Sequence, residues 1–286
     1  MEENLKKLLL KFNKICLKRW IRGVNNDISG VGLTLENELN KEVDSDLFPD
    51  FYNIELKSTQ RYSGYPISLF NKTLDGPRIF ETKYLVDKYG NDYFNGSDKK
   101  YLFVNLVHGK KVLVNEKYYF ELFLSIRDKK MYIYIFDLKN NLLDTSYIDF
   151  ISIEDHLSVK LSNLALVYAS KRKVDSNNYF RYYKLNFYKL ISIDKFYYLI
   201  QNNVIKISII CRASFSKKNI GKQKNKGINF KIFKDDLEKL FDKIFEYNAD
   251  DKTFLINSEF IFNDYDILSL GDDFEKEKHL AKWNKE

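Results

Sequence analysis

The sequence predicts a mixed α/β fold of the α+β type, in which helices flank a mixed sheet. Segments with apolar residues at helical spacing are interspersed with segments in which every second residue is apolar. Aromatic residues make up 16% of the chain, and many of them fall in the alternating segments, as is typical of strands. At 286 residues the chain is long enough for one large domain or two lobes, and we place a provisional division near residue 140.

The N-terminal half begins with a predicted amphipathic helix over residues 3–20. Its apolar positions share one side and are Leu5, Leu8, Leu9, Phe12 and Ile15. The segment "ISGVGLTLENELN" predicts a glycine-containing turn followed by a short helix over residues 33–41. Strands are expected in "FYNIELKSTQ" and "YPISLF", and a helix over residues 80–89 follows them.

The remaining elements are mostly strands. Aromatic-rich strands are predicted near residues 101–107, 112–125 and 131–137, and strand or loop continues to about residue 190. A helix over residues 193–202 leads into a strand, "VIKISIICRA", and then into a basic loop. The strand "INFKIF" and a helix in "KDDLEKLFDKIFEY" complete the predicted order. The sequence shows no internal repeat and no low-complexity linker.

Several classes of protein are excluded by composition. The apolar run "LLLKF" is too short and too close to lysines to be a signal peptide, and no stretch approaches the roughly 20 apolar residues of a membrane helix. We therefore expect a cytoplasmic protein without a membrane partner. The cysteines are Cys16 and Cys211, too few and too far apart for a disulfide framework or a thiolate metal site.

The positive charge is unevenly distributed. The net charge is +7, yet residues 195–234 carry ten Lys or Arg residues and no Asp or Glu, so the rest of the chain is slightly acidic. Clustered cations displace counterions from phosphates and so favour a polyanion such as DNA as the partner of this segment. A solvated surface loop is the alternative interpretation of the same residues.

The stretch "PDFYNIELKS", residues 49–58, places charged side chains inside an apolar strand. Alternation puts Ile54 and Leu56 on one face and both Glu55 and Lys57 on the other. Burying such charges without partners costs several kcal/mol. The position therefore indicates a bound ligand or a polar network, whereas the same acid-x-Lys pattern at helix or turn positions elsewhere carries little information.

A divalent metal is the simplest such ligand. Asp50 lies five residues before Glu55 and can join it only if the chain bends between them, for which Asn53 is a suitable turn residue. Two carboxylates supply the hard oxygen ligands that Mg²⁺ prefers. Lys57 then orients or helps to deprotonate an attacking water, or stabilises charge at a scissile phosphate.

Four motifs extend this interpretation. "GVGLTLENELN", "FPDFYNIELKST", "ISLF" and "KYLVDKYG", in this order, resemble the MvaI/BcnI group of type II restriction endonucleases, relatives of the MutH mismatch-repair nickase in the PD-(D/E)xK nuclease superfamily. The resemblance covers residues 28–90. It implies a restriction-endonuclease-like fold with residues 1–140 as the catalytic lobe. Residues 141–286 are then mainly the DNA-recognition lobe, which includes the basic segment 195–234.

The resemblance also implies roles for individual residues. Asp50 and Glu55 are expected to bind Mg²⁺, for which Mn²⁺ can substitute. Lys57 is the expected catalytic lysine, and Glu36 is expected to be a supporting carboxylate near the metal. A solvated helix acid is the alternative interpretation of Glu36.

The resemblance gives the basic segment a role in DNA recognition. In the family a late His-Gly followed by Phe-Arg belongs to the recognition lobe, and the corresponding text here is "GKQKNKGINFKI", with lysines in place of the His and the Arg. Lysine is a flexible point charge that discriminates bases less well than the arginine fork. We therefore expect phosphate contacts rather than a particular base sequence. The expected DNA-binding residues are Arg61, Lys222, Lys224, Lys226 and Lys231.

The expected function is Mg²⁺-dependent, sequence-specific hydrolysis of double-stranded DNA by a type II restriction endonuclease, acting as a monomer. A cognate DNA methyltransferase is expected in the same restriction-modification system, without a stable complex. Two alternatives remain open: a MutH-like, methylation-dependent nickase, and a DNA-binding protein without catalysis. Analysis of the products on a defined site separates double-strand cleavage from nicking, and DNA that is bound but never cut with Mg²⁺ or Mn²⁺ would indicate the DNA-binding protein without catalysis.

Overall fold

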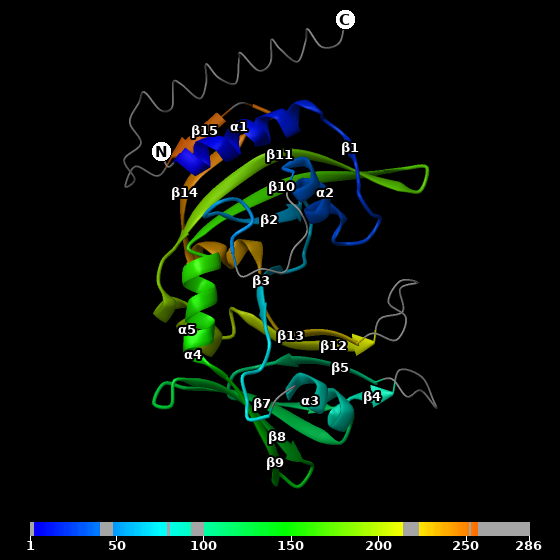
Figure 1. Cartoon of the computed structure of the whole chain (residues 1–286), viewed down its shortest axis with the longest axis vertical. Coiled ribbons are helices and arrows are strands. Elements are labelled where there is room, and N and C mark those ends of the chain that lie inside the picture. Colours follow the sequence, from blue (N-terminus) through cyan, green and yellow to red (C-terminus); the bar gives the residue numbers. More distant parts are fainter. Residues whose placement is uncertain are drawn as a thin grey trace, which may run out of the picture. The chain divides into compact units, whose positions relative to one another are not determined.

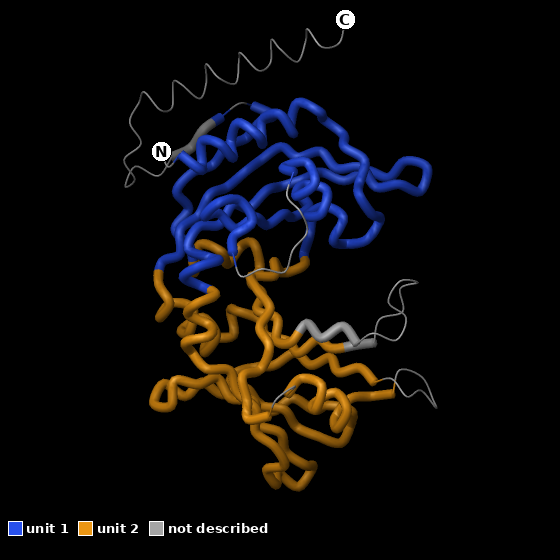
Figure 2. Tube along the Cα trace, in the orientation of Figure 1, with its two compact units in different colours: residues 1–64, 157–191, 241–286 blue, residues 65–156, 192–240 orange. Residues whose placement is uncertain are grey.

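The computed structural model describes residues 3–40, 48–78, 81–92, 100–213, 223–251 and 253–256. The fold is mixed α/β, as predicted (Figure 1). The chain forms two compact units (Figure 2), of which unit 1 contains residues 1–64, 157–191 and 241–286, and unit 2 contains residues 65–156 and 192–240.

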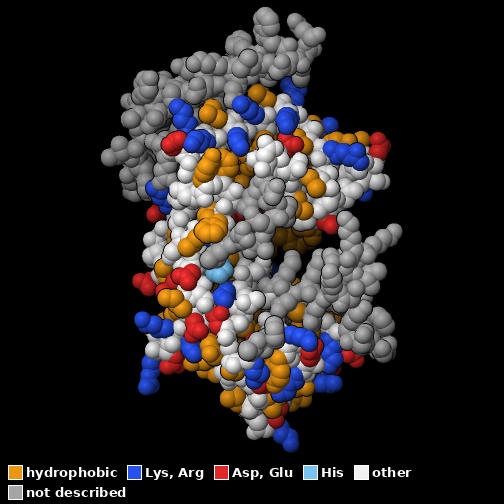
Figure 3. All heavy atoms as spheres, in the orientation of Figure 1, with side chains coloured by type: hydrophobic (Ala, Val, Ile, Leu, Met, Phe, Trp, Pro, Cys, Tyr) orange, Lys and Arg blue, Asp and Glu red, His pale blue; other side chains and the backbone are white. Residues whose placement is uncertain are grey.

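The described part of unit 1 contains α1 (Glu3–Leu17), β1 (Ile21–Arg22), α2 (Gly30–Glu38), β2 (Glu55–Gln60), β10 (Asn163–Val174), β11 (Asn177–Leu190), β14 (Phe241–Asn248) and β15 (Thr253–Ile256). Its strands form a sheet in the order β15-β14-β11-β10-β2, with β1 paired to β11. The apolar side of α1 packs with α2 against one face of this sheet, where Leu9, Leu35, Val167 and Phe180 are buried together. Lysines cover the outer side of α1 (Figure 3).

The parallel pairing of β2 with β10 determines how the chain is divided. Leu164 lies opposite Glu55, and Leu166 lies opposite Lys57. Parallel neighbours require a long crossover connection, and here residues 65–156 of unit 2 lie within that connection. Both units are therefore discontinuous, whereas the sequence suggested one division near residue 140.

The described part of unit 2 contains β3 (Ile67–Lys72), α3 (Glu81–Tyr89), β4 (Asn91–Asp92), β5 (Lys100–Leu106), β6 (Lys111–Val114), β7 (Tyr118–Ser125), β8 (Lys130–Asp137), β9 (Leu142–Asp149), α4 (Phe150–Asp155), α5 (Ile193–Gln201), β12 (Lys206–Ala213), β13 (Gln223–Ile232) and the 3₁₀ helix η2 (Lys234–Lys239). One sheet has the order β3-β13-β12-β5-β4, and a second is the antiparallel meander β6-β7-β8-β9. A π-helix, η1 (His156–Lys160), spans the boundary between the units in the sequence.

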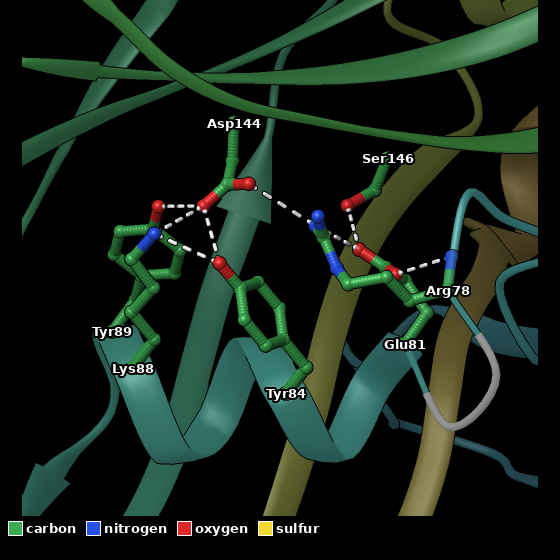
Figure 4. Close-up of polar contacts among 7 residues, drawn as sticks. All are labelled: Arg78, Glu81, Tyr84, Lys88, Tyr89, Asp144 and Ser146. Carbon is green, nitrogen blue, oxygen red and sulfur yellow. Dashed lines mark hydrogen bonds and ion pairs between the residues drawn. The ribbon is translucent and has the colours of Figure 1, made fainter.

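A polar network joins α3 to β9 (Figure 4). The Asp144 carboxylate accepts hydrogen bonds from Tyr84 (2.9 Å), Lys88 (2.8 Å) and Tyr89, and its other oxygen lies 3.2 Å from the Arg78 guanidinium. Tyr84 and Lys88 are four residues apart and therefore share one side of α3. The network thus satisfies a nearly buried carboxylate with donors from a single helix and the segment before it.

A second carboxylate extends this network. The buried Glu81 accepts a hydrogen bond from Ser146 (2.5 Å) and pairs with the Arg78 guanidinium (2.8 Å). Asp144 and Ser146 lie two residues apart on β9, so both side chains point to the same face of the strand. Alternation along β9 therefore aims both polar side chains at α3.

The segment predicted as one strand over residues 112–125 is a hairpin. Asn115 and Glu116 both have φ 55°, and with Lys117 they join β6 to β7. The Lys117 N–H donates a hydrogen bond to the Val114 carbonyl (3.1 Å), which closes the turn around them. Consecutive left-handed residues are typical of the type I′ turn, which matches the twist of paired strands. The prediction was wrong because this turn uses Asn-Glu and contains no glycine.

The helix predicted in residues 234–247 is also wrong. These residues form η2 and the strand β14. Phe245 pairs with Phe187 and Lys243 pairs with Tyr188, so Ile244 is an extra residue in a β-bulge. The bulge lets Phe241, Ile244 and Phe245 all be buried, a spacing of three and four that imitates a helix.

Gly227→Ala is expected to destabilise unit 2 by about 1–3 kcal/mol. Gly227 has φ +64° in a bulge of β13, and an added Cβ would lie 2.4 Å from the Lys72 carbonyl oxygen. Urea unfolding measures the loss. The control is Gly64→Ala, where no heavy atom lies within 4 Å of an added Cβ. Equal stability of the two variants would contradict the prediction.

None of the helices in the described ranges is long and apolar enough to cross a membrane.

Candidate active site

A tight turn brings Asp50 to the start of β2. Phe51 and Ile54 exchange two backbone hydrogen bonds of 2.9 Å, and Tyr52 has φ 53°. The Asp50 carboxylate accepts a hydrogen bond from the Leu56 backbone N–H (3.0 Å). The chain therefore bends before Glu55, as the sequence predicted, although Tyr52 rather than Asn53 takes the left-handed conformation.

Glu55 is the chemically unusual residue of this site. It is 1% exposed, and its Oε1 lies 2.5 Å from the Lys57 ammonium and 3.8 Å from the Lys160 ammonium. Burial raises the pKa of Glu55, the Lys57 charge opposes this rise, and the nearby Asp50 charge adds to it. Glu55 is thus a buried carboxylate whose ionised form depends on nearby positive charge.

The second oxygen of Glu55 indicates what the site can hold. Among the described residues the buried Oε2 has no hydrogen-bond partner, and leaving a buried oxygen unpaired is costly. Asp50 and Glu55 offer hard oxygen atoms, and the described ranges contain no group of three His, Cys, Asp or Glu side chains suited to a metal. Two carboxylates with retained waters fit Mg²⁺, which seldom uses a cage made only of protein ligands.

Comparison with known proteins places this chain in a family. A profile of the MvaI/BcnI restriction endonuclease family matches residues 9–241, most of the chain. The chain belongs to this family. The resemblance inferred from the four sequence motifs is confirmed, and membership makes this chain a type II restriction endonuclease, a site-specific deoxyribonuclease. Enzymes of this kind generally use divalent metal ions.

Solved structures agree with this family. Restriction endonuclease MvaI in complex with its cognate DNA substrate is similar to this chain with a TM-score of 0.78 and 25% sequence identity, over 85% of this chain and 98% of that chain. MvaI in the absence of DNA gives a TM-score of 0.53 and 22% identity over 85% and 97% of the two chains, a likeness of fold alone. No curated protein sequence matches the chain.

Lys160 is a residue of this MvaI/BcnI family member that the sequence did not single out. It is the last residue of η1 and stands four residues before Leu164, the partner of Glu55 in the parallel ladder. Its ammonium therefore reaches Glu55 from more than a hundred residues further along the chain. Only the pairing of β2 with β10 brings the two together.

Lys160→Gln is expected to lower the rate of DNA cleavage, measured with Mg²⁺ added, about tenfold at neutral pH, the size of a modest electrostatic contribution. Removing the positive charge raises the pKa of Glu55 further, so the acidic limb of the pH–rate profile should move to higher pH. Lys160→Arg keeps the charge and should retain most of the rate. An unchanged pH profile in Lys160→Gln would show that Lys160 does not act on Glu55.

Two further predicted residues lie in unit 1. Glu36 is half-buried on α2, and a Cβ added to Gly32 would lie 3.9 Å from its Oε1 and 3.5 Å from Ser58 Oγ on β2. Arg61 follows β2, is exposed, and places its guanidinium 5.5 Å from the Tyr62 ring centroid and 5.8 Å from that of Tyr183. Their roles near the metal and on DNA stay predictions.

The predicted DNA-binding lysines belong to unit 2. Lys222 lies outside the described residues, and only the backbone of Lys224 and Lys226 is described, in β13. Lys231 is half-buried and donates a hydrogen bond to Ser208 Oγ (2.9 Å). The structure therefore places Lys231 on the polar face of a sheet, within the strand that the sequence predicted in "INFKIF".

A row of polar side chains crosses this sheet, and the sequence did not predict it as a row. Strand register aligns Asn71, Asn229, Ser208 and Asn105 across β3, β13, β12 and β5. The Asn229 amide donates hydrogen bonds to Ser68 Oγ (3.1 Å) and to Asn71. Asn71 and Asn105, at the two ends of the row, are exposed. Four residues separated by up to 158 positions become neighbours only through sheet pairing.

Proposed function

We propose that Asp50, Glu55 and Lys57 form the catalytic centre of this endonuclease and that it hydrolyses double-stranded DNA with Mg²⁺. The observation that carries the proposal is the buried Glu55 carboxylate, which has one oxygen beside Lys57 and the other without a hydrogen-bond partner among the described residues. The turn before β2 places a second carboxylate, that of Asp50, at the start of the same strand. This arrangement supplies hard oxygen ligands and a cation in one place, which phosphodiester hydrolysis requires.

Asp50 and Glu55 would hold the Mg²⁺ ion, which when bound would supply Lewis-acid stabilisation of the charge that develops on the phosphoryl oxygens. Asp50 is held in place by the Leu56 N–H, and Glu55 is held by burial, so neither carboxylate has to reorganise. Lys57, partly exposed, orients the attacking water and offsets negative charge at phosphorus. The water oxygen bonds to phosphorus while the bond to the 3′ oxygen breaks, which leaves 5′-phosphate and 3′-hydroxyl ends.

Glu36 and unit 2 complete the proposal. Glu36 acts as the supporting carboxylate on α2. Lys222, Lys224, Lys226 and Lys231 contact DNA phosphates, and Arg61 contacts a phosphate near the cut. Lysines in these positions favour affinity over base readout. The protein acts as a monomer in the cytoplasm, and a cognate methyltransferase protects the host's own sites without forming a stable complex.

The test is digestion of unmethylated phage and plasmid DNA with and without Mg²⁺, followed by sequencing of the ends. The controls are Glu55→Ala and Lys57→Ala. Discrete fragments that need metal and are absent with both variants are expected. Nicked circles without linear DNA would instead indicate a strand-specific nickase. DNA that is bound but stays intact with Mg²⁺ and Mn²⁺ would refute the proposed catalytic centre.

A further inference from the structure

Unit 1 carries a second basic surface, distant in sequence from the segment 195–234. Residues 171–173 at the end of the β10–β11 hairpin and residues 19–22 around β1 carry five cations between them, and one acid, Asp175, stands in the hairpin turn. The five cations are Arg19, Arg22, Lys171, Arg172 and Lys173. All of them are exposed, and basic side chains gather at the end of this hairpin in Figure 3.

Strand register places part of this surface on the face of the sheet that carries the proposed catalytic residues. Glu55 and Lys57 point to the same side as Leu164 and Leu166, their partners on β10. The register shift near Tyr168 adds a residue to β11, not to β10, so alternation along β10 continues unbroken to Arg172. On this face Leu166 is buried and Arg172 is exposed, so the face becomes accessible to solvent toward the C-terminal end of β10.

Arg172 stands in a cross-strand row. It pairs with Tyr179 on β11, and Tyr179 pairs in turn with Arg22 on β1. The Arg172 guanidinium lies 4.3 Å from the Trp20 ring centroid and 5.7 Å from that of Tyr179. The Arg22 guanidinium donates a hydrogen bond to Asn177 (3.1 Å). Two aromatic rings close to the Arg172 guanidinium limit its motion and leave its outward N–H groups available to an anion.

The backbone beneath this row is also fixed. The Gly23 N–H donates to the Asn178 carbonyl (2.7 Å), and the Asn178 N–H donates to the Asn26 side chain (2.8 Å). An added Cβ at Gly23 would lie 2.9 Å from the Phe180 ring, so the two segments are in close contact here. The hairpin end and β1 therefore form one preorganised surface rather than two independent loops.

We propose that Arg22 and Arg172, supported by Trp20 and Tyr179, contact the phosphate backbone of the DNA substrate outside the cut site. Six residues of β10 separate Arg172 from the partner of Lys57, a distance of about 20 Å at the usual strand rise. This corresponds to about six base pairs of duplex. The inference rests on the proposed position of the catalytic centre, because the shared face of the sheet is what makes duplex DNA the fitting polyanion.

The test measures binding of a mixed-sequence duplex, several helical turns long, to the full chain without divalent metal and at several salt concentrations. Each lost phosphate contact lowers the slope of log affinity against log salt by about 0.9. Arg172→Gln should show one such decrease, and the Arg22→Gln/Arg172→Gln double variant should show about two. The matched control is Lys14→Gln, an exposed cation of α1 on the opposite side of the sheet, which should keep the parental slope.

Trp20 provides a second readout at the surface itself. The chain has two tryptophans, Trp20 and Trp283. In a Trp283→Phe background, Trp20 is the remaining indole, and its emission should change when the duplex binds. The change should be lost when Arg172→Gln is added and kept when Lys14→Gln is added.

The outcomes separate this surface from the catalytic centre. The proposed surface would be overturned if the double variant bound DNA with the parental salt slope and the Trp20 emission did not change on binding. The catalytic proposal would stand if the protein nevertheless cleaved DNA. A reduced salt slope in the double variant, together with a change in Trp20 emission on DNA binding, would support the surface. If Glu55→Ala still cut DNA, that result would refute the catalytic proposal alone.

Discussion

Glu55→Gln is expected to lower Mg²⁺-dependent cleavage by about three orders of magnitude, equivalent to about 4 kcal/mol of transition-state stabilisation. The substitution preserves the volume of the side chain and removes the charge proposed to hold the divalent ion. DNA binding in the absence of metal should be retained, because Glu55 is buried and repels rather than attracts phosphate. Single-turnover cleavage rates measure the loss.

The same variant should be more stable than the parent in metal-free buffer at neutral pH. Burial raises the folded-state pKa of Glu55, so the folded protein bears a cost whenever this carboxylate is ionised. The gain in folding stability from the Gln substitution is therefore present above the folded-state pKa of Glu55, and it disappears as pH falls below the unfolded-state pKa of about 4.3. Urea unfolding at neutral and acidic pH tests the sign.

The control for both readouts is Glu116→Gln, an exposed acid in the β6–β7 turn. It should change neither cleavage nor the pH dependence of stability. A Glu55→Gln protein that cuts DNA at the parental rate would remove Glu55 from the catalytic centre, whatever its stability.

Asp144→Ala is expected to destabilise unit 2 by about 3 kcal/mol, because it leaves several hydrogen-bond donors without their acceptor around a mostly buried position. Tyr84, Lys88 and Tyr89 all donate to this carboxylate. Burial alone raises the pKa of Asp144, but hydrogen bonds from Lys88 and the two tyrosines outweigh it and hold the pKa below its ordinary value. The side chain thus stabilises the fold in its ionised form.

The sign of the pH dependence follows from that lowered pKa. The contribution of Asp144 is fully present above its unfolded-state pKa of about 3.9 and is lost as pH falls through the lower folded-state value. The stability gap between parent and Asp144→Ala should therefore be widest near neutral pH and should narrow in acid. Asp87→Ala, at an exposed position of the same helix, is the control. A gap independent of pH would contradict the electrostatic explanation.

The catalytic strand shows what local sequence can determine. Alternation in "FYNIELKS" assigns Glu55 and Lys57 to one face because side chains on a strand alternate whatever their partners are. The need for a bend after Asp50 follows from the same parity. Helices over residues 3–17 and 193–201 were predicted within a few residues, since their apolar stripes are strongly periodic.

Long-range pairing decided the rest, because hydrogen bonds between strands are not encoded in the spacing of neighbours along the chain. The bulge at Ile244 gave the strand β14 an apolar spacing typical of a helix. The turn at Asn115 and Glu116 contains no glycine, so the sequence did not indicate that it separates two strands. The parallel ladder between β2 and β10 brought Lys160 to Glu55 and continued the face of the proposed catalytic residues to Arg172. The sequence by itself determined the residue types of the candidate active site and the face of the strand on which they lie. Only the tertiary structure decided which distant cations share that face.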